Sequence, residues 1–351
     1  MTAGVERVPV FLLTGFLGSG KTTLLNALLK RPEFANTAVI VNEFGEIGLD
    51  HFLIERSQDN VVLLEAGCLC CTIADSLHET LADLNFRRVR GDIPPFARVV
   101  IETTGLADPA PILNTLLGNR LVTDHYRLEG VVVTVDAQHA LAELDAHAES
   151  VKQVAVADRL AVTKLDMVAM PAELHARLVA LNPRAEVVES REGEAALHAF
   201  APIDTHRVAA ATYADHDHDH EHRDHAAEVN RHDAHVKAHC FVVDDPASWA
   251  GVAAWWRVMT EACGDRLLRC KGILRIHDTG EIVFVQGVQR VFHRPERLPG
   301  WPDADHRSRL VCITRDVEPE VLRAALGALQ LPPGSDPGIA SLPEFNVRKS
   351  Q

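Results

Sequence analysis

The feature that most restricts the fold of this chain is a glycine-rich loop set between an apolar run and a helical run. The apolar run Val8–Leu13 leads into the sequence GFLGSGKT at residues 15–22, and leucines at helical spacing follow in TTLLNALLK. Glycines allow successive backbone N–H groups to turn inward around phosphate oxygens, and the N-terminus of the following helix adds partial positive charge. The order of strand, loop and helix therefore predicts a parallel α/β sheet with a phosphate site at the end of its first strand.

The residues of this loop have separate expected roles. We expect the Lys21 ammonium to reach the β- and γ-phosphates of a nucleotide, and the Thr22 hydroxyl to hold Mg²⁺. The phosphate contacts expected from the loop are Gly15, Gly18, Ser19, Gly20, Lys21, Thr22 and Thr23. A chance glycine-rich turn is the alternative, and the apolar run and helical run on either side of the loop argue against it.

Short β-branched runs alternate with longer amphipathic runs through the first part of the chain. Helical patterns occur, for example, at Thr22–Lys30 and Ile73–Val89. The expected strands are almost continuously apolar, as strands covered on both faces must be, and they are Val8–Leu13, Thr37–Val41, Val61–Glu65, Arg98–Glu102, Gly130–Val135 and Arg159–Thr163. This alternation predicts an α/β fold with a doubly wound, mainly parallel sheet.

Composition divides the chain further. Residues 215–239 read DHDHDHEHRDHAAEVNRHDAHVKAH and contain almost no large apolar side chain, so they cannot bury enough surface to offset the entropy cost of ordering. Beyond them, strand-like runs and two helical runs, Trp249–Cys263 and Pro319–Leu329, predict a small α+β domain with a mostly antiparallel sheet. The expected parts are a first domain at 1–205, a flexible His-rich linker at 206–238, a second domain at 239–331 and a tail at 332–351.

An acidic segment at the end of the fourth expected strand belongs to the same crevice as the glycine-rich loop. Residues 102–105 read Glu-Thr-Thr-Gly, and ligands of open parallel sheets bind at the carboxyl ends of the strands. We expect Glu102 to hold Mg²⁺, directly or through water, and the Gly105 N–H to sense the γ-phosphate. Lys21, Thr22 and Glu102 form the expected catalytic set, and no residue stands out as a catalytic base. An N-capping acid beside a turn is the alternative for Glu102.

The segment Thr163-Lys164-Leu165-Asp166 follows the strand at 159–163. A carboxylate at the position of Asp166 accepts two hydrogen bonds from the guanine N1–H and exocyclic amine, while the stem of Lys164 lies along the ring. Adenine lacks this pair of donors. The segment, read together with the upstream loop, therefore predicts GTP as the nucleotide, with Thr163, Lys164 and Asp166 at the base.

Three of the seven cysteines, Cys68, Cys70 and Cys71, stand together between an expected strand and an expected helix. The helix N-terminus favours thiolates, and thiolates select Zn²⁺, Cu⁺ or similar ions. A structural zinc site needs four ligands, whereas this loop offers three, so we expect an open site that suits exchange. A redox dithiol and buried inert cysteines are the alternatives. The scattered cysteines 240, 263, 270 and 312 are expected to be small buried hydrophobes.

Two further segments offer metal ligands. Glu43 and Glu46 lie in the sequence NEFGE after the second expected strand, where either carboxylate is placed to join the same metal or Mg²⁺; a solvated acidic loop is an equal alternative. In the linker, histidines alternate with acids, a pattern that binds Zn²⁺, Ni²⁺ or Co²⁺ weakly and in many geometries. These histidines are His216, His218, His220, His222 and His225, of which the first four are the candidate weak ligands. A linker without a metal role and the remnant of an affinity tag are the alternatives.

Charge and hydropathy exclude several classes of partner. The formal net charge of −14 argues against nucleic acid, because a phosphate backbone requires a basic surface. No run approaches the roughly 20 apolar residues needed to span a bilayer, and the N-terminus lacks a basic region before a long apolar run. The tight cysteine cluster is typical of a reducing compartment. We therefore expect a cytoplasmic protein that binds neither membrane nor nucleic acid.

The motifs GFLGSGKTTLLN, NEFGE, GCLCC, ETTGLADP and TKLD, taken in this order, resemble the CobW-type P-loop GTPases, a family of GTP-dependent metallochaperones. Beyond the linker, LLRCKGILRI, FVQGVQRVF and SRLVCITR resemble the C-terminal domain of the same family, so the resemblance covers nearly the whole chain. A GCxCC cluster inside a P-loop domain is highly specific to this family.

The resemblance implies a GTPase of low intrinsic rate that carries Zn²⁺ or Co²⁺ to an apo-metalloprotein client or a cofactor pathway. It implies Mg²⁺–GTP at Gly15–Thr23, metal at the three clustered cysteines, and a second base-contacting loop at residues 182–185. Some relatives carry an acid before the NEFGE asparagine, where this chain has Val41. Open alternatives are a metal buffer with a minor nucleotide role, a cobalt-delivery accessory protein of cobalamin synthesis, and a P-loop kinase of a small metabolite. A homodimer is left open.

Overall fold

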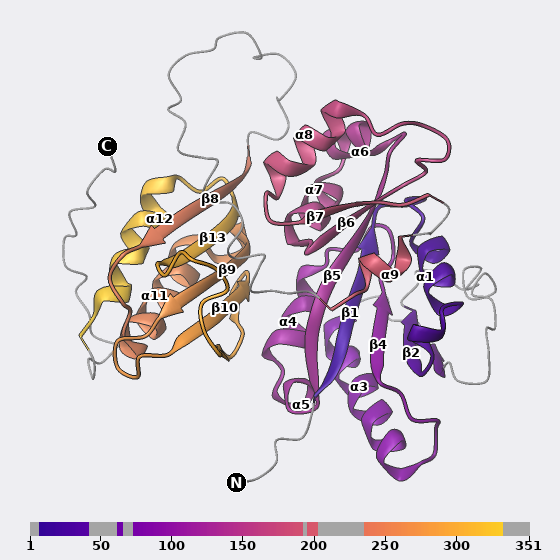
Figure 1. The fold of residues 1–351 in the computed structure, drawn as a ribbon, viewed down its shortest axis with the longest axis horizontal. Helices are drawn as coiled ribbons and strands as arrows, with labels where there is room; N and C mark the ends of the chain where they lie inside the picture. The colour runs from indigo at the N-terminus through magenta and orange to yellow at the C-terminus, as the bar shows by residue number, and fades with distance from the viewer. Residues whose placement is uncertain (1–6, 42–61, 66–72, 192–194, 203–234, 333–351) are drawn as a thin grey trace. The chain divides into compact units, whose positions relative to one another are not determined.

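The structure is a computed structural model, and it describes residues 7–41, 62–65, 73–191, 195–202 and 235–332. The chain forms two compact units, Met1–Ile203 and Asp204–Gln351 (Figure 1). None of the helices in the described ranges is both long enough and apolar enough to cross a bilayer.

The first unit is built on a seven-stranded sheet with the order β3-β2-β4-β1-β5-β6-β7. Every neighbouring pair of these strands is parallel. The strands are β1 Val8–Gly15, β2 Thr37–Val41, β3 Val62–Glu65, β4 Arg98–Glu102, β5 Tyr126–Asp136, β6 Arg159–Thr163 and β7 Glu186–Glu189. The predicted doubly wound parallel sheet is confirmed, with β1 at its centre.

The apolar run of β1 is explained by the layers on both sides of it. Val10 and Leu12 are fully buried, and Phe11 and Leu13 pack in one cluster with the leucines of the following helix. Burying a side chain of this size contributes about 1.5–3 kcal/mol. A strand with two covered faces therefore reads as continuously apolar, without the alternation of a half-exposed strand.

Helices cover both faces of this sheet (Figure 1). Leucines of α1 pack with alanines of α9 over β1 and β2, while α3 contacts α4 and α5, and α7 contacts α8. The helices are α1 Lys21–Leu29, α3 Ile73–Arg90, α4 Ala110–Gly118, α5 Arg120–Thr123, α6 Ala140–Ala146, α7 Ala148–Val156, α8 Ala172–Leu181 and α9 Ala196–Ala199, with a 3-10 turn at Pro32–Phe34. The expected helices at 22–30 and 73–89 are thus confirmed to within one residue at each end.

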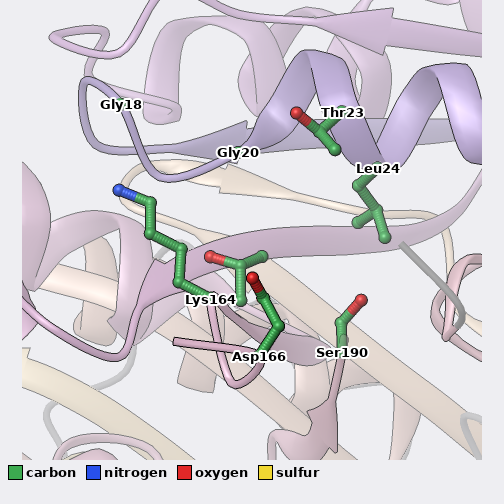
Figure 2. Close-up of a pocket in the computed structure, with 8 residues that line it drawn as sticks. Gly18, Gly20, Thr23, Leu24, Lys164, Asp166 and Ser190 are labelled. Atoms are coloured by element: carbon green, nitrogen blue, oxygen red, sulfur yellow. The ribbon is translucent and has the colours of Figure 1, made fainter. Parts of the chain in front are cut away.

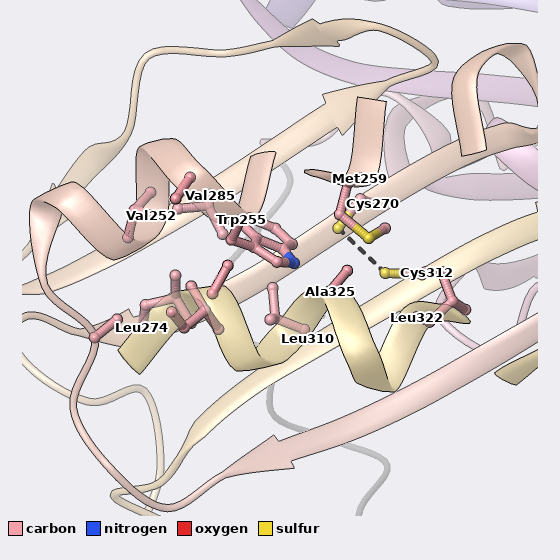
Figure 3. Close-up of a cluster of buried hydrophobic side chains, with 14 of the residues drawn as sticks. Val252, Trp255, Met259, Cys270, Leu274, Val285, Leu310, Cys312, Leu322 and Ala325 are labelled. Atoms are coloured by element: carbon pink, nitrogen blue, oxygen red, sulfur yellow. Dashed lines mark hydrogen bonds between the residues drawn. The ribbon is translucent and has the colours of Figure 1, made fainter. Parts of the chain in front are cut away.

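The second unit is an antiparallel sheet in the order β11-β10-β9-β13-β8, with β12 paired to β10. Helices α11 and α12 cover one face, and Trp255, Leu274 and Leu310 are fully buried beneath them (Figure 3). The elements are β8 Val236–Val243, α11 Trp249–Cys263, β9 Leu267–Arg275, β10 Ile282–Val288, β11 Val291–Phe292, β12 Glu296–Leu298, β13 Ser308–Arg315 and α12 Pro319–Leu326, with 3-10 turns at Gly264–Arg266 and Gly327–Gln330. The predicted α+β domain with an antiparallel sheet is confirmed.

Strand boundaries in the second unit differ from the expectation. β8 begins at Val236, inside the stretch 206–238 that the sequence indicated as linker, because Val236 pairs with Arg315 at the end of β13. β9 begins at Leu267 and includes Arg269 and Lys271, which interrupt the apolar pattern of the sequence although both side chains are buried. Long basic side chains bury their stems in such positions, so a polar letter does not end the strand.

Three of the scattered cysteines are buried, as expected for small hydrophobes, and Cys240 on the edge strand β8 is exposed, contrary to that expectation. The Cys270 and Cys312 sulfurs lie 3.5 Å apart across β9 and β13 (Figure 3). The hydrogen bond with Cys270, together with burial, raises the pKa of Cys312 well above 9, and burial raises the pKa of Cys263 to about 11. The thiols of Cys263 and Cys312 are therefore protonated at neutral pH.

Candidate functional site

The loop between β1 and α1 folds tightly over the end of the sheet. Gly15, Gly18 and Gly20 have φ values of +144°, +70° and +91°, a region that residues with a side chain rarely adopt. A Cβ atom at Gly15 would lie 2.3 Å from the Oγ1 atom of Thr134 on β5. Glycine is therefore sterically required at the start of the loop, and α1 begins at its end, with Lys21.

Side-chain hydrogen bonds hold Ser19 and Lys21 within this loop. Ser19 Oγ donates to the carbonyl of Phe16 at 2.7 Å and lies 2.6 Å from Thr134 Oγ1. Lys21 Nζ donates to the carbonyls of Gly15 and Phe16, at 2.9 and 3.0 Å. The ammonium group thus lies against the loop backbone, where a phosphate bound by the loop would meet it.

Thr22 and Glu102 meet where α1 passes the end of β4. Glu102 is the last residue of β4 and is 4% exposed, and its Oε1 atom accepts a hydrogen bond from Thr22 Oγ1 at 3.0 Å. A hydroxyl and a carboxylate are hard oxygen ligands of the kind that Mg²⁺ takes, usually alongside waters and phosphate oxygens. The donor chemistry of these two residues therefore fits Mg²⁺.

The loop after β4 is held between the glycine-rich loop and α7. A Cβ atom at Gly105 would lie 2.6 Å from the backbone nitrogen of Leu17. On the other side, Gln153 of α7 is 1% exposed, and its Nε2 atom donates to the carbonyls of Gly105 and Ala107, at 3.1 Å each. The two loops expected at the γ-phosphate are thus in direct contact.

A pocket of about 300 Å³ lies between the glycine-rich loop and the ends of β6 and β7 (Figure 2). Thr163 Oγ1 donates to the carbonyl of Ser19 at 2.7 Å, which joins the end of β6 to the loop. The residues that line the pocket are Gly18, Gly20, Thr23, Leu24, Thr163, Lys164, Asp166 and Ser190. The structure therefore brings the TKLD segment and the glycine-rich loop to one cavity, although they are far apart in sequence.

Asp136, the last residue of β5, is an acid beside this pocket that the sequence analysis did not single out. It is 2% exposed, and its Oδ2 atom accepts a hydrogen bond from Lys164 Nζ at 2.5 Å and lies 2.8 Å from His139 Nδ1. Burial by itself raises the pKa of Asp136, but the hydrogen bonds from Lys164, His139 and the Gln138 N–H outweigh burial and hold that pKa below 3.8. Asp136 is therefore a carboxylate at neutral pH.

Ser190 is a second pocket residue that the sequence analysis missed. It follows β7, is 1% exposed, and its Oγ atom has no hydrogen-bond partner among the described residues. The prediction that residues 182–185 contact the base is wrong. This turn precedes β7, so it lies at the amino ends of the parallel strands, whereas the pocket lies at their carboxyl ends. Asn182 instead donates to three backbone carbonyls at the end of α7. Ser190 gave no signal in the sequence, because β7, the strand that it follows, was not predicted.

Apart from Thr22 and Glu102, the metal ligands expected from the sequence lie outside the described residues. They are Glu43, Glu46, Cys68, Cys70, Cys71, His216, His218, His220 and His222. Within the described ranges, no group of three or more His, Cys, Asp or Glu side chains is arranged to hold a metal ion. The segment with Glu43 and Glu46 follows β2, and the segment with the three cysteines follows β3. The carboxyl ends of these two strands lie beside Glu102 at the end of β4.

Comparison with known proteins agrees with this geometry. The CobW/HypB/UreG nucleotide-binding domain matches residues 9–189, and the C-terminal domain of the cobalamin synthesis protein CobW matches residues 236–330. The zinc chaperone YjiA of Escherichia coli is 33% identical over 93% of this chain and 100% of its own. The zinc chaperone CobW of Pseudomonas aeruginosa is 30% identical over 90% and 89%.

Similarity to a solved structure covers both units. The crystal structure of the Zn(II)-bound YjiA GTPase from E. coli superposes with a TM-score of 0.66 at 28% identity, and it covers 93% of this chain and 100% of that one. Sequence motifs, sheet topology and this similarity all agree. The chain therefore belongs to the CobW/HypB/UreG family of P-loop GTPases and carries the CobW C-terminal domain.

Proposed function

We propose that this protein is a GTP-hydrolysing metallochaperone, which binds Zn²⁺ or Co²⁺ at the three cysteines of the GCLCC motif and transfers the ion to an apo-metalloprotein client. The observation that carries the proposal is the pocket itself, with the Thr22–Glu102 pair by the glycine-rich loop and the TKLD segment on its far wall. Family membership supports it, and so do the names of two relatives, both zinc chaperones.

In the proposed site, side chains and backbone position GTP for hydrolysis. The loop N–H groups and Lys21 bind the phosphates, Asp166 accepts hydrogen bonds from guanine, and Thr22 and Glu102 hold Mg²⁺, which when bound neutralises charge on the phosphates. Catalysis of phosphoryl transfer consists mainly of such positioning and charge stabilisation. Rotation of Thr22 Oγ1 away from Glu102 would free both oxygens for this role.

The metal ion is the cargo of the proposed cycle. Three thiolates on one loop are soft ligands that suit Zn²⁺ and leave a coordination position open, unlike the closed four-ligand sites that stabilise a fold. Glu43 or Glu46 is proposed to complete the site. The linker histidines are proposed to collect ions weakly and raise their concentration near the thiolates.

GTP turnover is proposed to release the cargo by a population shift. With GTP bound, the NEFGE and ETTG loops adopt one arrangement, in which carboxylate and thiolate ligands converge, and loss of the γ-phosphate releases these loops. Because metal and GTP favour the same state, each raises the affinity of the chain for the other.

The proposed setting is the cytoplasm, with GTP, a divalent metal ion and an apo-metalloprotein client as partners, and a homodimer remains an alternative assembly. We also propose the stretch after residue 205 as a His-rich linker between two domains. A metal buffer whose working part is that linker is the competing function. The lysine and threonine of an intact GKT sequence, at the start of α1, favour the chaperone.

Phosphate release from GTP and ATP tests the enzymatic part of the proposal. We expect GTP to be hydrolysed in preference to ATP, and Glu102→Gln to lower kcat by about 100-fold while GDP binding persists. Replacing Cys68, Cys70 and Cys71 with Ser should abolish the tight Zn²⁺ site and leave GTP binding intact. Equal hydrolysis of ATP, or a tight zinc site that survives the three replacements, would overturn the proposal.

A further inference from the structure

Lys164 has a backbone conformation that is rare for a residue with a side chain. Its φ is +60°, in the left-handed region, and its carbonyl accepts hydrogen bonds from the N–H groups of Met167 and Val168, at 3.0 and 3.2 Å. Such a conformation persists only where neighbouring groups fix it. The turn that follows carries the exposed Asp166, so whatever fixes Lys164 also sets the direction of the Asp166 carboxylate.

The end of β5 supplies the fixing contacts. Asp136 Oδ2 accepts the hydrogen bond of Lys164 Nζ at 2.5 Å. The same strand ends are joined by a backbone hydrogen bond, in which Ala137 N donates to Thr163 O at 3.2 Å, and the Thr163 hydroxyl oxygen lies 3.2 Å from Val135 O. The Asp136 carboxylate is itself held by His139 and the Gln138 N–H. It is therefore a rigid, buried anchor for a half-exposed lysine.

We propose that Asp136 is the positioning residue of the base site, which anchors the Lys164 ammonium to β5 and thereby orients the turn that presents Asp166 to guanine. Lys164 and Asp166 line the pocket, whereas Asp136 is not among the lining residues, so it acts through Lys164. The inference rests on the proposed binding of GTP at the TKLD segment. It adds a residue to that site which belongs to neither the glycine-rich loop nor the TKLD motif.

Asp136→Asn tests this role, because it removes the charge and keeps the shape. We expect the KM for GTP and the Kd for GDP to rise together by about 10- to 100-fold, the scale of a lost charge-assisted hydrogen bond. The kcat should stay within about twofold, since Lys164 and Asp166 are proposed to contact the base and not the γ-phosphate. A purely structural role would lower Tm and the active fraction but leave KM unchanged.

A double-mutant cycle with Lys164→Met isolates the pair. If Asp136 acts through Lys164, Asp136→Asn should add little further loss of affinity in the Lys164→Met background. Asp145→Asn is the matched control, because Asp145 is an acid on α6 whose partner is Arg177, and it should leave KM unchanged. Full additivity of the two losses would overturn the inference.

The outcomes separate this inference from the proposed function. A wild type that prefers GTP, combined with an unchanged KM in Asp136→Asn, overturns the inference alone. A wild type that binds ATP as well as GTP overturns both. If Asp136→Asn does not fold, Asp136→Glu replaces it: this variant keeps the charge but moves the carboxylate by one methylene, so KM should still rise, and an unchanged KM contradicts the inference.

Discussion

The carboxylate of Asp166 is the single group that decides base selection in the proposed site. Its two oxygens are both acceptors, and guanine presents two donors, N1–H and the exocyclic amine, on one edge. The structure places Asp166 on the wall of the pocket, across from the glycine-rich loop (Figure 2). An amide at the same position would offer one acceptor and one donor, which matches xanthine and not guanine.

Asp166→Asn should therefore lower GTP affinity by about 1.5–3 kcal/mol, the scale of a hydrogen bond to a charged group, and raise the affinity for XTP. Competition against a fluorescent GDP analogue measures both changes. Asp124→Asn is the control, since that exposed acid belongs to a weak surface pair with Arg120, 3.8 Å away. Tight GTP binding by Asp166→Asn would show that another group selects the base.

The surroundings of Glu143 on α6 raise its pKa, whereas those of Asp136 lower its pKa. Burial raises the pKa of Glu143 above 4.5, and the charge of Asp136 raises it further, against the lowering effect of His139, Lys164 and His147. A carboxyl whose pKa is higher in the folded state binds its proton more tightly there. The folded state is therefore favoured at low pH, and this contribution is lost as pH rises through the folded pKa.

Glu143→Gln removes this ionisation, so it should raise Tm at pH 7 by no more than a few degrees, and the difference should shrink as pH falls toward 4.5. Thermal unfolding of both proteins from pH 4.5 to 8 measures it. Glu149→Gln, in the first turn of the neighbouring helix α7, serves as the control. A difference in Tm that does not change with pH would contradict the electrostatic origin.

At the scale of elements, α7 connects the loops around the expected γ-phosphate. Gln153 holds two carbonyls of the ETTGLADP segment, and Lys152 Nζ, the residue before it, lies 2.6 Å from Asp108 Oδ2. At the start of the same helix, the ring of His147 stacks on Phe16 of the glycine-rich loop, with centroids 4.6 Å apart. One helix thus sets the spacing of both loops.

Gln153→Leu should leave two buried carbonyls without this donor and cost about 1–3 kcal/mol of stability. Because Gly105 is expected at the γ-phosphate, we also expect GTP affinity to fall by about fivefold or more while GDP affinity changes little. Isothermal titration with both nucleotides measures the ratio, and Gln330→Leu in the second unit is the control. Equal losses for GTP and GDP would mean that α7 supports the fold and not the γ-phosphate loop.

Most of the first sheet could be predicted from the sequence, because strands covered on both faces are long apolar runs and their bounds follow from composition. β7 was missed since its sequence EVVE is short and polar at both ends, as an edge strand allows. The strand expected at Gly130–Val135 was too short, because Arg127 and Glu129 interrupt the apolar pattern before it. In the structure these two side chains pair with each other, and β5 begins at Tyr126. Local composition records burial, but it does not record such pairings.

The candidate site was predictable where its residues stand in motifs. The glycine-rich loop, Glu102 and the TKLD segment could be assigned because each combines a strand end with a recognisable chemistry. Asp136, Gln153 and Ser190 are single polar residues, and their importance arises only from contacts with Lys164, Gly105 and the pocket. The sequence did contain one indication of Asp136, because this acid directly follows the apolar run VVVTV. Ligands of open parallel sheets bind at the carboxyl ends of such strands.

In the chain as a whole, residues 215–225 alternate histidines with acids. Deleting residues 215–233 should lower the number of weakly bound Zn²⁺ ions and leave one tight site. GTP hydrolysis should stay within about twofold, because a tether contributes little to a folded core. A Gly/Ser segment of equal length is the control for spacing. Loss of the tight site on deletion would place the main metal site in the linker and favour the buffer.

One titration tests whether the binding of nucleotide and the binding of metal are coupled. Zn²⁺ affinity is measured by competition with a chromophoric chelator, without nucleotide, with GDP, and with Mg²⁺ and a non-hydrolysable GTP analogue. We expect the tightest binding of Zn²⁺ with the analogue, by about 5- to 150-fold, and no nucleotide dependence after replacement of Cys68, Cys70 and Cys71 with Ser. Equal Zn²⁺ affinity in all three conditions would rule out this coupling and leave a GTPase that binds metal without delivering it.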